Sequence, residues 1–349
     1  MLDLAQAGLF TGYDAPMTDT HKNTEKQDFE ACVTEMTQRV FGQAAQALTR
    51  LSGGASQESW RFAVAGQNYV LRRTPGGRAR DRATALSLSS EAQILQVAGQ
   101  HGLPVPQVAH ICDAADGLGE AYIMDFIEGE TIARKILRDA DFDIIRPQLA
   151  AQCGTALAAL HNIPRASIPD MPVSDAKGEL TRYKQAYEAA DHPHPVFELA
   201  FAWLAENLPP PRQQTLVHGD FRNGNLMISP DKGVVAILDW ELAHLGDPME
   251  DLGWICVPSW RFGQHDLPVG GFGLRQAMYD AYQAAGGIID ERAIRFWEIL
   301  GTLKWGIMCS AMMVQAFESG LDRSVERGSI GRRASETEID LLRMLQQLD

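Results

Sequence analysis

The chain has 349 residues, of which 45% are apolar and 22% charged, a composition typical of a globular protein large enough for two lobes. Its formal net charge of −14 argues against a nucleic-acid partner, because binding to nucleic-acid phosphates needs clustered Lys and Arg. The cysteines are scattered without a C-x-x-C pair, so we expect neither a disulfide framework nor a zinc site. They are Cys32, Cys112, Cys153, Cys256 and Cys309.

The N-terminus and the apolar segments predict a cytoplasmic protein without a membrane partner. Residues 1–22 lack a basic start followed by an apolar stretch, so they do not resemble a secretory signal. The longest apolar window, residues 305–317, is too short and too mixed to span a bilayer.

The pattern of apolar residues predicts a loose tail over residues 1–25, a first lobe over 26–127 and a second over 128–349. A helix is expected from about Phe29 to Leu48. Residues 60–64 and 68–72 flank Ala65-Gly66-Gln67 and predict a hairpin, with a further strand expected before it. A helix over 90–100, capped by Ser89 or Ser90, and strands over 107–112 and 121–126 complete the first lobe.

The second lobe is predicted to be mostly helical. Helical patterns cover residues 144–161, 180–207, 273–285, 292–317 and 336–348. The last begins with Ser335 and Glu338 at the spacing of a capping box. One short β-rich island, residues 215–240, interrupts these helices. The expected fold class is therefore α+β, with a small antiparallel sheet plus a helix and a larger helical lobe.

The polar residues with the strongest chemical signal lie in and just after this island. From Leu216 the sequence reads L-V-H-G-D-F-R-N-G-N-L-M-I-S, then G-V-V-A-I-L-D-W-E, then G-D-P-M-E-D-L. A hairpin over 226–229 and 234–238 should bring Asp220, Asn225 and Asp239 to one mouth. Phosphoryl transfer needs a carboxylate at the attacking hydroxyl, and an Asn and an Asp to hold magnesium on the nucleotide.

This motif resembles the Brenner-type motif of the aminoglycoside phosphotransferase and choline kinase family, which is related in fold to protein kinases. The step from Asp220 to Asn225 matches the protein-kinase catalytic loop, and Asp239 begins the segment at the D-F-G position. The resemblance covers about residues 47–317. It implies a two-lobed protein-kinase-like fold with a nucleotide-binding first lobe and a catalytic, substrate-binding second lobe.

The implied activity is transfer of the γ-phosphate of ATP to a hydroxyl of a small molecule, with Mg²⁺ as the metal cofactor. On this resemblance Asp220 is the catalytic base, while Asn225 and Asp239 ligate magnesium. His218 is expected to pack within the loop. Asp247 is expected to cap the following helix, and Asp251 is implied to stabilise the loop from within.

Weaker nucleotide-binding motifs lie in the first lobe. Ser52, Gly53 and Gly54 lie between predicted strands, where glycines let the backbone approach phosphates closely. Arg72 stands where kinases usually carry a lysine, and we favour it over its neighbour Arg73.

A glutamate and a hinge complete the implied nucleotide site. Glu91 lies on the helix stripe that faces the core, and the resemblance makes it the ion-pair partner of Arg72; the alternative is a solvated first-turn glutamate. Residues 122–129 resemble the adenine-binding hinge, which contains Asp125, with Met124 and Ile127 against the base.

Two other functions remain open on the sequence. A metal-dependent phosphohydrolase would use a two-metal centre. Its ligands would be His218, Asp220, Asp239, His244 and Asp247. A non-catalytic nucleotide-binding regulator is suggested by the missing lysine. A protein kinase is disfavoured because H-G-D replaces H-R-D and no A-P-E follows, and no G-x-x-x-x-G-K-[ST] indicates a P-loop kinase.

The acceptor is the least determined feature. The strings V-L-R-R and H-G-D-F-R resemble kinase-like domains fused to acyl-CoA dehydrogenases, which implies a hydroxylated acyl compound such as a hydroxyacyl-CoA. Its anionic groups could meet Arg72, Arg73, Arg78, Arg80 and Arg82. An amino alcohol or aminoglycoside would instead need an acidic, aromatic pocket. Candidates for that pocket are Glu250, Trp254, Trp260 and Trp305.

Overall fold

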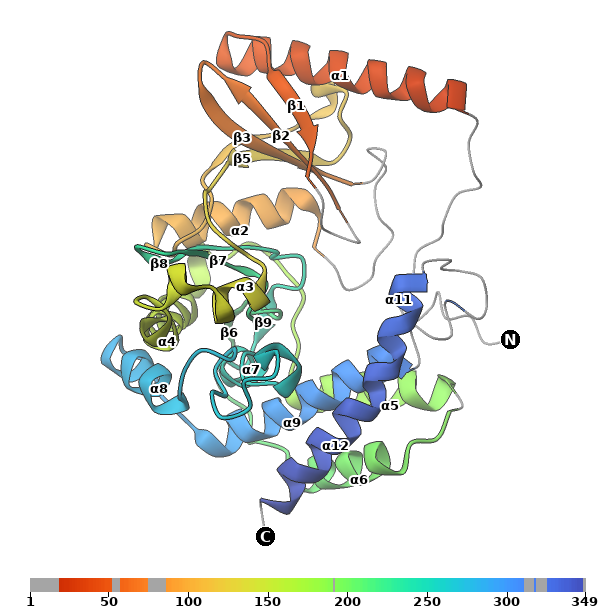
Figure 1. Ribbon diagram of the computed structural model, residues 1–349, viewed down its shortest axis with the longest axis vertical. Helices are drawn as coiled ribbons and strands as arrows, with labels where there is room; N and C mark the ends of the chain where they lie inside the picture. Colours follow the sequence, from red (N-terminus) through yellow and green to blue (C-terminus); the bar gives the residue numbers. More distant parts are fainter. Residues whose placement is uncertain are drawn as a thin grey trace.

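The computed structural model describes residues 19–51, 57–74, 86–190, 192–310, 317 and 325–347. It has two lobes, and the chain passes from one to the other after β5 (Figure 1). Ser52, Gly53 and Gly54 lie outside the described residues. So do three of the five arginines considered for an acyl-CoA acceptor, Arg78, Arg80 and Arg82.

The N-terminal lobe is built on a five-stranded antiparallel sheet of order β1-β2-β3-β5-β4. Its strands are β1 (Gln46–Arg50), β2 (Glu58–Val64), β3 (Gln67–Arg73), β4 (Val108–Ile111) and β5 (Ala121–Asp125). Ala65 and Gly66, with φ of 52° and 83°, form the two-residue turn between β2 and β3. The predicted hairpin and the strands on either side of it are confirmed.

Two helices cover opposite faces of this sheet (Figure 1). α1 (Asp19–Phe41) packs Val33 and Met36 against Leu71 and the other apolar side chains of one face, and α2 (Leu88–Gln100) packs against Tyr122 on the other. Because side chains alternate along a strand, Arg72 lies on the α2 face.

Three expectations for these helices are wrong. α1 begins at Asp19, inside the segment predicted as a tail. The prediction missed this start because the first residues of the helix are polar and carry no apolar periodicity. It ends at Phe41 rather than Leu48, since Gly42 adopts the left-handed conformation (φ 76°). The cap of α2 is Ser87, whose side chain accepts a hydrogen bond from the Ser90 amide at 3.0 Å.

The C-terminal lobe is mostly helical, as predicted. Its helices are α3 (Ala133–Arg138), α4 (Leu149–His161), α5 (Ala176–Ala190), α6 (Pro195–Glu206), α7 (Met249–Trp254), α8 (Arg275–Ala284), α9 (Glu291–Ile307), α11 (Val325–Ile330) and α12 (Ala334–Gln346). The helix predicted over 180–207 is two helices, because Pro193 lies between them and Pro195 begins the second. Within the described parts of the chain, no helix is both long and apolar enough to cross a membrane.

The predicted capping box at the last helix is wrong. α12 begins at Ala334, so Ser335 lies inside its first turn, and the residue before the helix, Arg333, makes no side-chain cap. The helix instead continues directly from a 3₁₀ turn, η9 (Gly331–Arg333), which already provides its first hydrogen bonds.

The β-rich island lies against α2 and α4, at the junction of the lobes (Figure 1). β6 (Thr215–Val217) pairs with β9 (His244–Gly246), and β7 (Leu226–Ser229) pairs with β8 (Gly233–Ile237). Backbone hydrogen bonds tie the island to the α2 region, including Ile237 N to Pro104 O at 2.8 Å. The hairpin β7–β8 matches the prediction.

The close contact between α4 and α8 in the C-terminal lobe leads to a stability prediction. A Cβ added to Gly154 of α4 would collide with the Met278 carbonyl of α8 and lie 3.1 Å from the Tyr282 amide. Gly154→Ala should therefore lower the free energy of unfolding by about 1–3 kcal/mol, measured in urea.

Gly99→Ala in α2 is the matched control, because its Cβ would lie 3.5 Å from Val105, at ordinary contact distance. That change should leave stability unchanged or raise it by about 0.5–1 kcal/mol, since alanine favours a helix over glycine. Equal effects of the two substitutions would contradict the close packing of α4 on α8.

Candidate active site

The Asp220 loop, residues 218–225, presents one carboxylate held by three donors. Trp254 Nε1 donates to Asp220 Oδ1 at 2.8 Å, and Arg222 Nε donates to the same oxygen at 3.0 Å. Asn225 Nδ2 donates to Oδ2 at 2.6 Å. These contacts fix the rotamer of Asp220, and the contributions of Arg222 and Trp254 were not predicted from the sequence.

Asp251 supports this loop from below, as the sequence resemblance implied. Its fully buried carboxylate accepts hydrogen bonds from the amides of His218 at 2.8 Å and Gly219 at 3.0 Å. His161 Nε2 lies 3.2 Å from the same group. Burial raises the pKa of Asp251, but the hydrogen bond and charge of His161 outweigh it and hold the pKa below its usual value.

Glycine is required at the centre of the loop. Gly219 has φ of 77°, and a Cβ there would lie 2.5 Å from the Leu242 carbonyl. The side chain of any other residue would push the Asp220 loop away from the segment that precedes β9.

His218 is a packed, neutral member of the loop. Its Nδ1 accepts a hydrogen bond from the Asp220 amide at 3.2 Å, and its Nε2 donates to the Leu238 carbonyl at 3.1 Å. Its ring centroid lies 4.6 Å from that of Trp240. Both ring nitrogens are therefore engaged. Burial lowers the pKa of His218, which favours the neutral imidazole.

Asn225 and Asp239 are brought together by the hairpin between them. The Leu238 amide donates to the Asn225 carbonyl at 2.8 Å, directly before Asp239. Asp239 has φ of 67°, a left-handed conformation that is uncommon outside glycine and clusters at functional sites. Asn225 directs its amide nitrogen toward Asp220, so its Oδ1 points away from that carboxylate.

Arg72 connects the two lobes through carboxylates on different elements. Its Nη2 lies 2.6 Å from Asp239 Oδ1, and its Nε lies 3.3 Å from Glu91 Oε1 on α2. The Tyr122 hydroxyl donates to Glu91 at 3.1 Å. The sequence-predicted Arg72, Glu91 and Asp239 are thus brought together in one cluster, in which Glu91 is buried and Asp239 is partly exposed.

Burial and charge act in opposite directions on this cluster. Burial lowers the pKa of Arg72, but the attraction of Glu91 and Asp239 outweighs it and raises that pKa well above its usual value. Burial raises the pKa of Glu91 to about 7, although the charge of Arg72 lowers it. Arg72 Nε and Glu91 Oε2 are both buried without a hydrogen-bond partner.

The connection between the lobes contains the segment predicted as the adenine-binding hinge. Met124 and Ile127 are partly buried, and the Asp125 amide donates to the Gln107 carbonyl at 2.9 Å. Within the described residues, the backbone of Ile127 makes no hydrogen bond, so its N–H and C=O remain available to the edge of a planar ligand.

The donor set fits a hard cation such as Mg²⁺. Asn225 Oδ1 and the Asp239 carboxylate are oxygen ligands, and the Asp239 side chain is 35% exposed while Asn225 is buried beside it. These are the residues that would hold magnesium on a nucleotide.

The residues proposed for a two-metal hydrolase have other partners. Both ring nitrogens of His218 are used, and His244 Nε2 lies 3.2 Å from Glu250. Asp247 accepts hydrogen bonds from the Met249 amide at 3.0 Å and from Trp297 Nε1 at 3.1 Å. The residue at the N-cap of α7 is Pro248 rather than the predicted Asp247, which lies one residue earlier. This arrangement argues against the phosphohydrolase alternative.

The aromatic candidates for an acidic pocket lie against one another, but the acidic candidate, Glu250, is already paired. The ring of Trp260 lies 5.5 Å from Trp254 and 5.0 Å from Trp305. Glu250, the acidic candidate, is buried and paired with His244 at 3.2 Å and with Lys304 at 3.6 Å. Its charge is therefore neutralised within the protein.

The pairing of His244 with Glu250 predicts a pH-dependent stability. Burial lowers the pKa of His244, but Glu250 outweighs it and raises the pKa from 6.5 to about 9. The stabilisation is therefore fully present below pH 6.5 and is lost as the pH rises through about 9. His244→Gln should cost about 3 kcal/mol of unfolding free energy at pH 6, and this cost should shrink toward pH 9.5.

Urea titrations of both proteins across this pH range measure the difference. A cost that stays constant with pH would contradict a charged His244.

Comparison with known proteins places this geometry in a family. The phosphotransferase enzyme family matches residues 47–297. Acyl-CoA dehydrogenase family member 11 of Gallus gallus is 30% identical over 234 residues, which are 64% of this chain and 29% of that protein. Family member 10 of Mus musculus is 30% identical over 221 residues, 60% of this chain and 20% of that protein. The chain therefore spans less than a third of the length of these relatives.

Solved structures share the fold over nearly the whole chain. A protein of Ralstonia eutropha assigned as an aminoglycoside phosphotransferase has a TM-score of 0.71 at 22% identity, covering 91% of this chain and 98% of that one. A choline/ethanolamine kinase family protein of Mesorhizobium loti has a TM-score of 0.61 at 18% identity, covering 92% and 95%. A spectinomycin phosphotransferase solved with ADP and spectinomycin has a TM-score of 0.60 at 12% identity, covering 90% and 97%.

The family match extends from β1 into α9 and includes the Asp220 loop, Asp239 and Arg72. The chain therefore belongs to the phosphotransferase enzyme family, with a kinase-like fold.

Proposed function

We propose that the chain transfers the γ-phosphoryl group of ATP to a hydroxyl of a small molecule, with magnesium as cofactor. The observation that carries this proposal is the set of contacts around one hairpin. Asn225 donates to Asp220, the β7–β8 hairpin leads from Asn225 to Asp239, and Arg72 contacts Asp239. The spectinomycin phosphotransferase, solved with ADP, supports nucleotide binding by this fold.

Asp220 is the residue that accepts or orients the proton of the attacking hydroxyl. Its three donors, Trp254, Arg222 and Asn225, hold the carboxylate in one rotamer, so little reorganisation is needed when the hydroxyl arrives. Bound magnesium would neutralise charge on the phosphates, and Asn225 and Asp239 would hold it there.

Arg72 takes the phosphate-binding place of the usual lysine in this proposal. Glu91 holds its Nε side, which leaves the Nη groups to bridge phosphate oxygens. One of these groups contacts Asp239 at 2.6 Å, and that contact would have to loosen for Asp239 to bind the metal. Met124, Asp125 and Ile127 would form the wall and the backbone edge for adenine.

The charges around the tryptophans disfavour a cationic acceptor, whether an amino alcohol or an aminoglycoside. Arg222 lies 4.8 Å from the Trp260 ring, Lys304 lies 5.3 Å from the Trp254 ring, and Arg333 lies 5.8 Å from the Trp305 ring. A cationic acceptor would meet aromatic faces that already have protein cations against them. A hydroxyacyl compound, including a hydroxyacyl-CoA thioester, is therefore our preferred acceptor.

We also infer a cytoplasmic location. The five cysteines are all free, and Cys153, Cys256 and Cys309 are buried, which suits a reducing compartment that supplies ATP.

Release of ADP from Mg-ATP tests this function. The acceptor panel comprises hydroxyacyl-CoA thioesters, sugars, amino alcohols and aminoglycosides, and turnover should depend on a member of the first group. Asp220→Asn should lower kcat on the order of 10²–10⁴-fold, because the general base is lost. Asp239→Ala should abolish magnesium-dependent nucleotide binding.

Asp231→Asn is the matched control, because this aspartate lies exposed in the turn between β7 and β8. It should keep wild-type kcat and KM. Nucleotide binding without turnover on any acceptor would favour the regulator, and the absence of nucleotide binding would refute the kinase.

Arg72 gives a separate prediction. Arg72→Lys should retain activity with a modest rise in the KM for ATP, because an ammonium group can still contact phosphate and Glu91. Arg72→Ala should raise that KM by at least tenfold, since it leaves Glu91 buried without its cation. Initial rates at varied ATP concentration measure both, and equal KM values in all three proteins would rule out a phosphate-binding role.

A further inference from the structure

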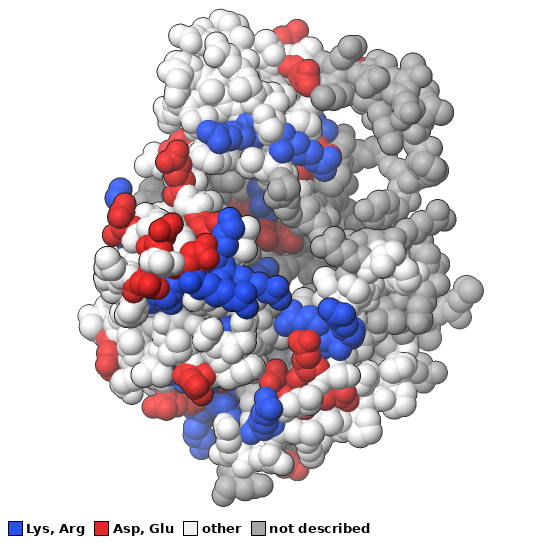
Figure 2. All heavy atoms as spheres, viewed as in Figure 1, with Lys and Arg blue, Asp and Glu red and all other residues white. Residues whose placement is uncertain are grey.

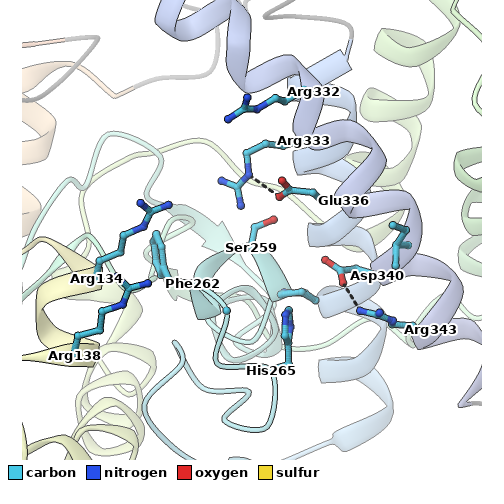
Figure 3. A pocket seen from close by; sticks show the side chains of 13 residues that line it. Arg134, Arg138, Ser259, Phe262, His265, Arg332, Arg333, Glu336, Asp340 and Arg343 are labelled. Atoms are coloured by element: carbon cyan, nitrogen blue, oxygen red, sulfur yellow. Dashed lines mark hydrogen bonds and ion pairs between the residues drawn. The ribbon is translucent and has the colours of Figure 1, made fainter.

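A second charged site lies in the C-terminal lobe, away from Asp220. Lys and Arg side chains gather across the middle of one face of the molecule (Figure 2). On this lobe a cavity of about 610 Å³ opens between α3 and the start of α12 (Figure 3). We call it the arginine cavity. Its charged lining consists of Arg134, Arg138, Arg332, Arg333 and Arg343, with the carboxylates of Glu336 and Asp340.

The arginine cavity has more positive than negative groups in a protein whose net charge is −14. Arg333 Nε donates to Glu336 at 3.0 Å, and Arg343 lies 3.9 Å from Asp340. The other three arginines, Arg134, Arg138 and Arg332, form no ion pair with any residue that the structure describes.

These three guanidinium groups, which have no ion-pair partner among the described residues, come from opposite sides of the cavity. Figure 3 shows Arg134 and Arg138 projecting from α3 on one side, and Arg332 on the other. Like charges around one cavity repel each other, and an anion between them would remove that repulsion. Guanidinium groups also match phosphate oxygens with paired N–H donors, which favours a phosphate over a halide or a single carboxylate.

The lining between these arginines suits an organic phosphate. The buried Ser259 offers a hydroxyl, and Phe262, held at φ of 48°, places its ring beside Arg134. A polar hydroxyl and an apolar ring next to the cations fit a phosphate ester attached to a carbon chain.

A row of aromatic rings connects the arginine cavity with the Asp220 loop. Trp254 donates to Asp220 at 2.8 Å, and the row continues through Trp260 to Trp305 at centroid distances of 5.5 and 5.0 Å. Arg333 of the cavity lies 5.8 Å from the Trp305 ring. Asp220 and the arginine cavity are thus connected by an unbroken series of side-chain contacts.

We propose that the arginine cavity binds a phosphate group carried by the acceptor while the acceptor's hydroxyl lies at Asp220. The phosphate-binding part stands on the cavity itself, and the link to the acceptor rests on the proposed function. This assigns Arg134, Arg138 and Arg332 to acceptor recognition, at the other end of the aromatic row from Asp220.

Binding of methyl phosphate tests the cavity directly, because this probe has no nucleobase and no hydroxyl to phosphorylate. Calorimetric titration uses the full chain with its nucleotide site saturated by ADP. Wild-type protein should bind the probe, and the double variant Arg134→Ala/Arg138→Ala should bind it at least tenfold more weakly. The affinity should also fall as salt is added, since the contact is ionic.

Lys135→Ala is the matched control, since Lys135 lies on the same helix, pairs with Glu130 at 2.9 Å and does not line the cavity. It should bind methyl phosphate as the wild type does. The charge-preserving variant Arg134→Lys/Arg138→Lys should recover part of the affinity, which a general loss of folding would not allow. Equal binding in wild type and the Ala double variant, or no binding to the wild type, would overturn the site.

The source of the phosphate is tested by kinetics. Two acceptors are compared, a hydroxyacyl-CoA thioester and the matching hydroxyacyl-pantetheine thioester, which carries no phosphate. The Ala double variant should raise the KM of the first at least tenfold, while kcat, the KM for ATP and the KM of the second stay unchanged. An equal effect on both acceptors would overturn the link to the acceptor.

The two proposals fail in different ways. Methyl phosphate binding that depends on Arg134 and Arg138, without turnover of any acceptor, would refute the proposed function and the acceptor link but support the phosphate site. Turnover that depends on Asp220 in a protein that does not bind methyl phosphate would refute the site alone.

Discussion

The ion-pair cluster around Arg72 is the interaction on which the arrangement of the candidate active site depends. It joins β3 and α2 of one lobe to Asp239 of the other, through contacts of 3.3 Å to Glu91 and 2.6 Å to Asp239. A buried cation of this kind is stable only while its carboxylate partners remain in place. The position of Asp239, and through its hairpin that of Asn225, is therefore coupled to the packing of the N-terminal lobe.

Buried charged groups around the candidate site shape what it can accept. Asp251 holds the backbone of the Asp220 loop, so the loop is supported by a fully buried carboxylate. Glu250 is neutralised by Lys304 and His244, which removes the negative charge that a cationic acceptor would need. The same lobe carries three exposed arginines, Arg134, Arg138 and Arg332, that make no ion pair with the described part of the chain. These features together favour an acceptor with negative charge.

The sequence predicts the local features well because their causes are local. Alternating side chains define the hairpin of β2 and β3, and the order of Asp220, Asn225 and Asp239 follows from one turn and one hairpin. The start of α1 was missed because its first residues are polar and carry no periodic apolar signal. The neutralisation of Glu250 could not be predicted, because its partner Lys304 is distant in sequence and is brought close only by tertiary packing.

The fate of the γ-phosphoryl group tests the central claim most directly. ATP labelled at the γ-phosphate is incubated with the protein and each candidate acceptor, and the products are separated into inorganic phosphate and organic ester. The account predicts label in an ester of one acceptor class, formed by the wild type and lost in Asp220→Asn. Label released only as inorganic phosphate, at the same rate with and without acceptor, would contradict it.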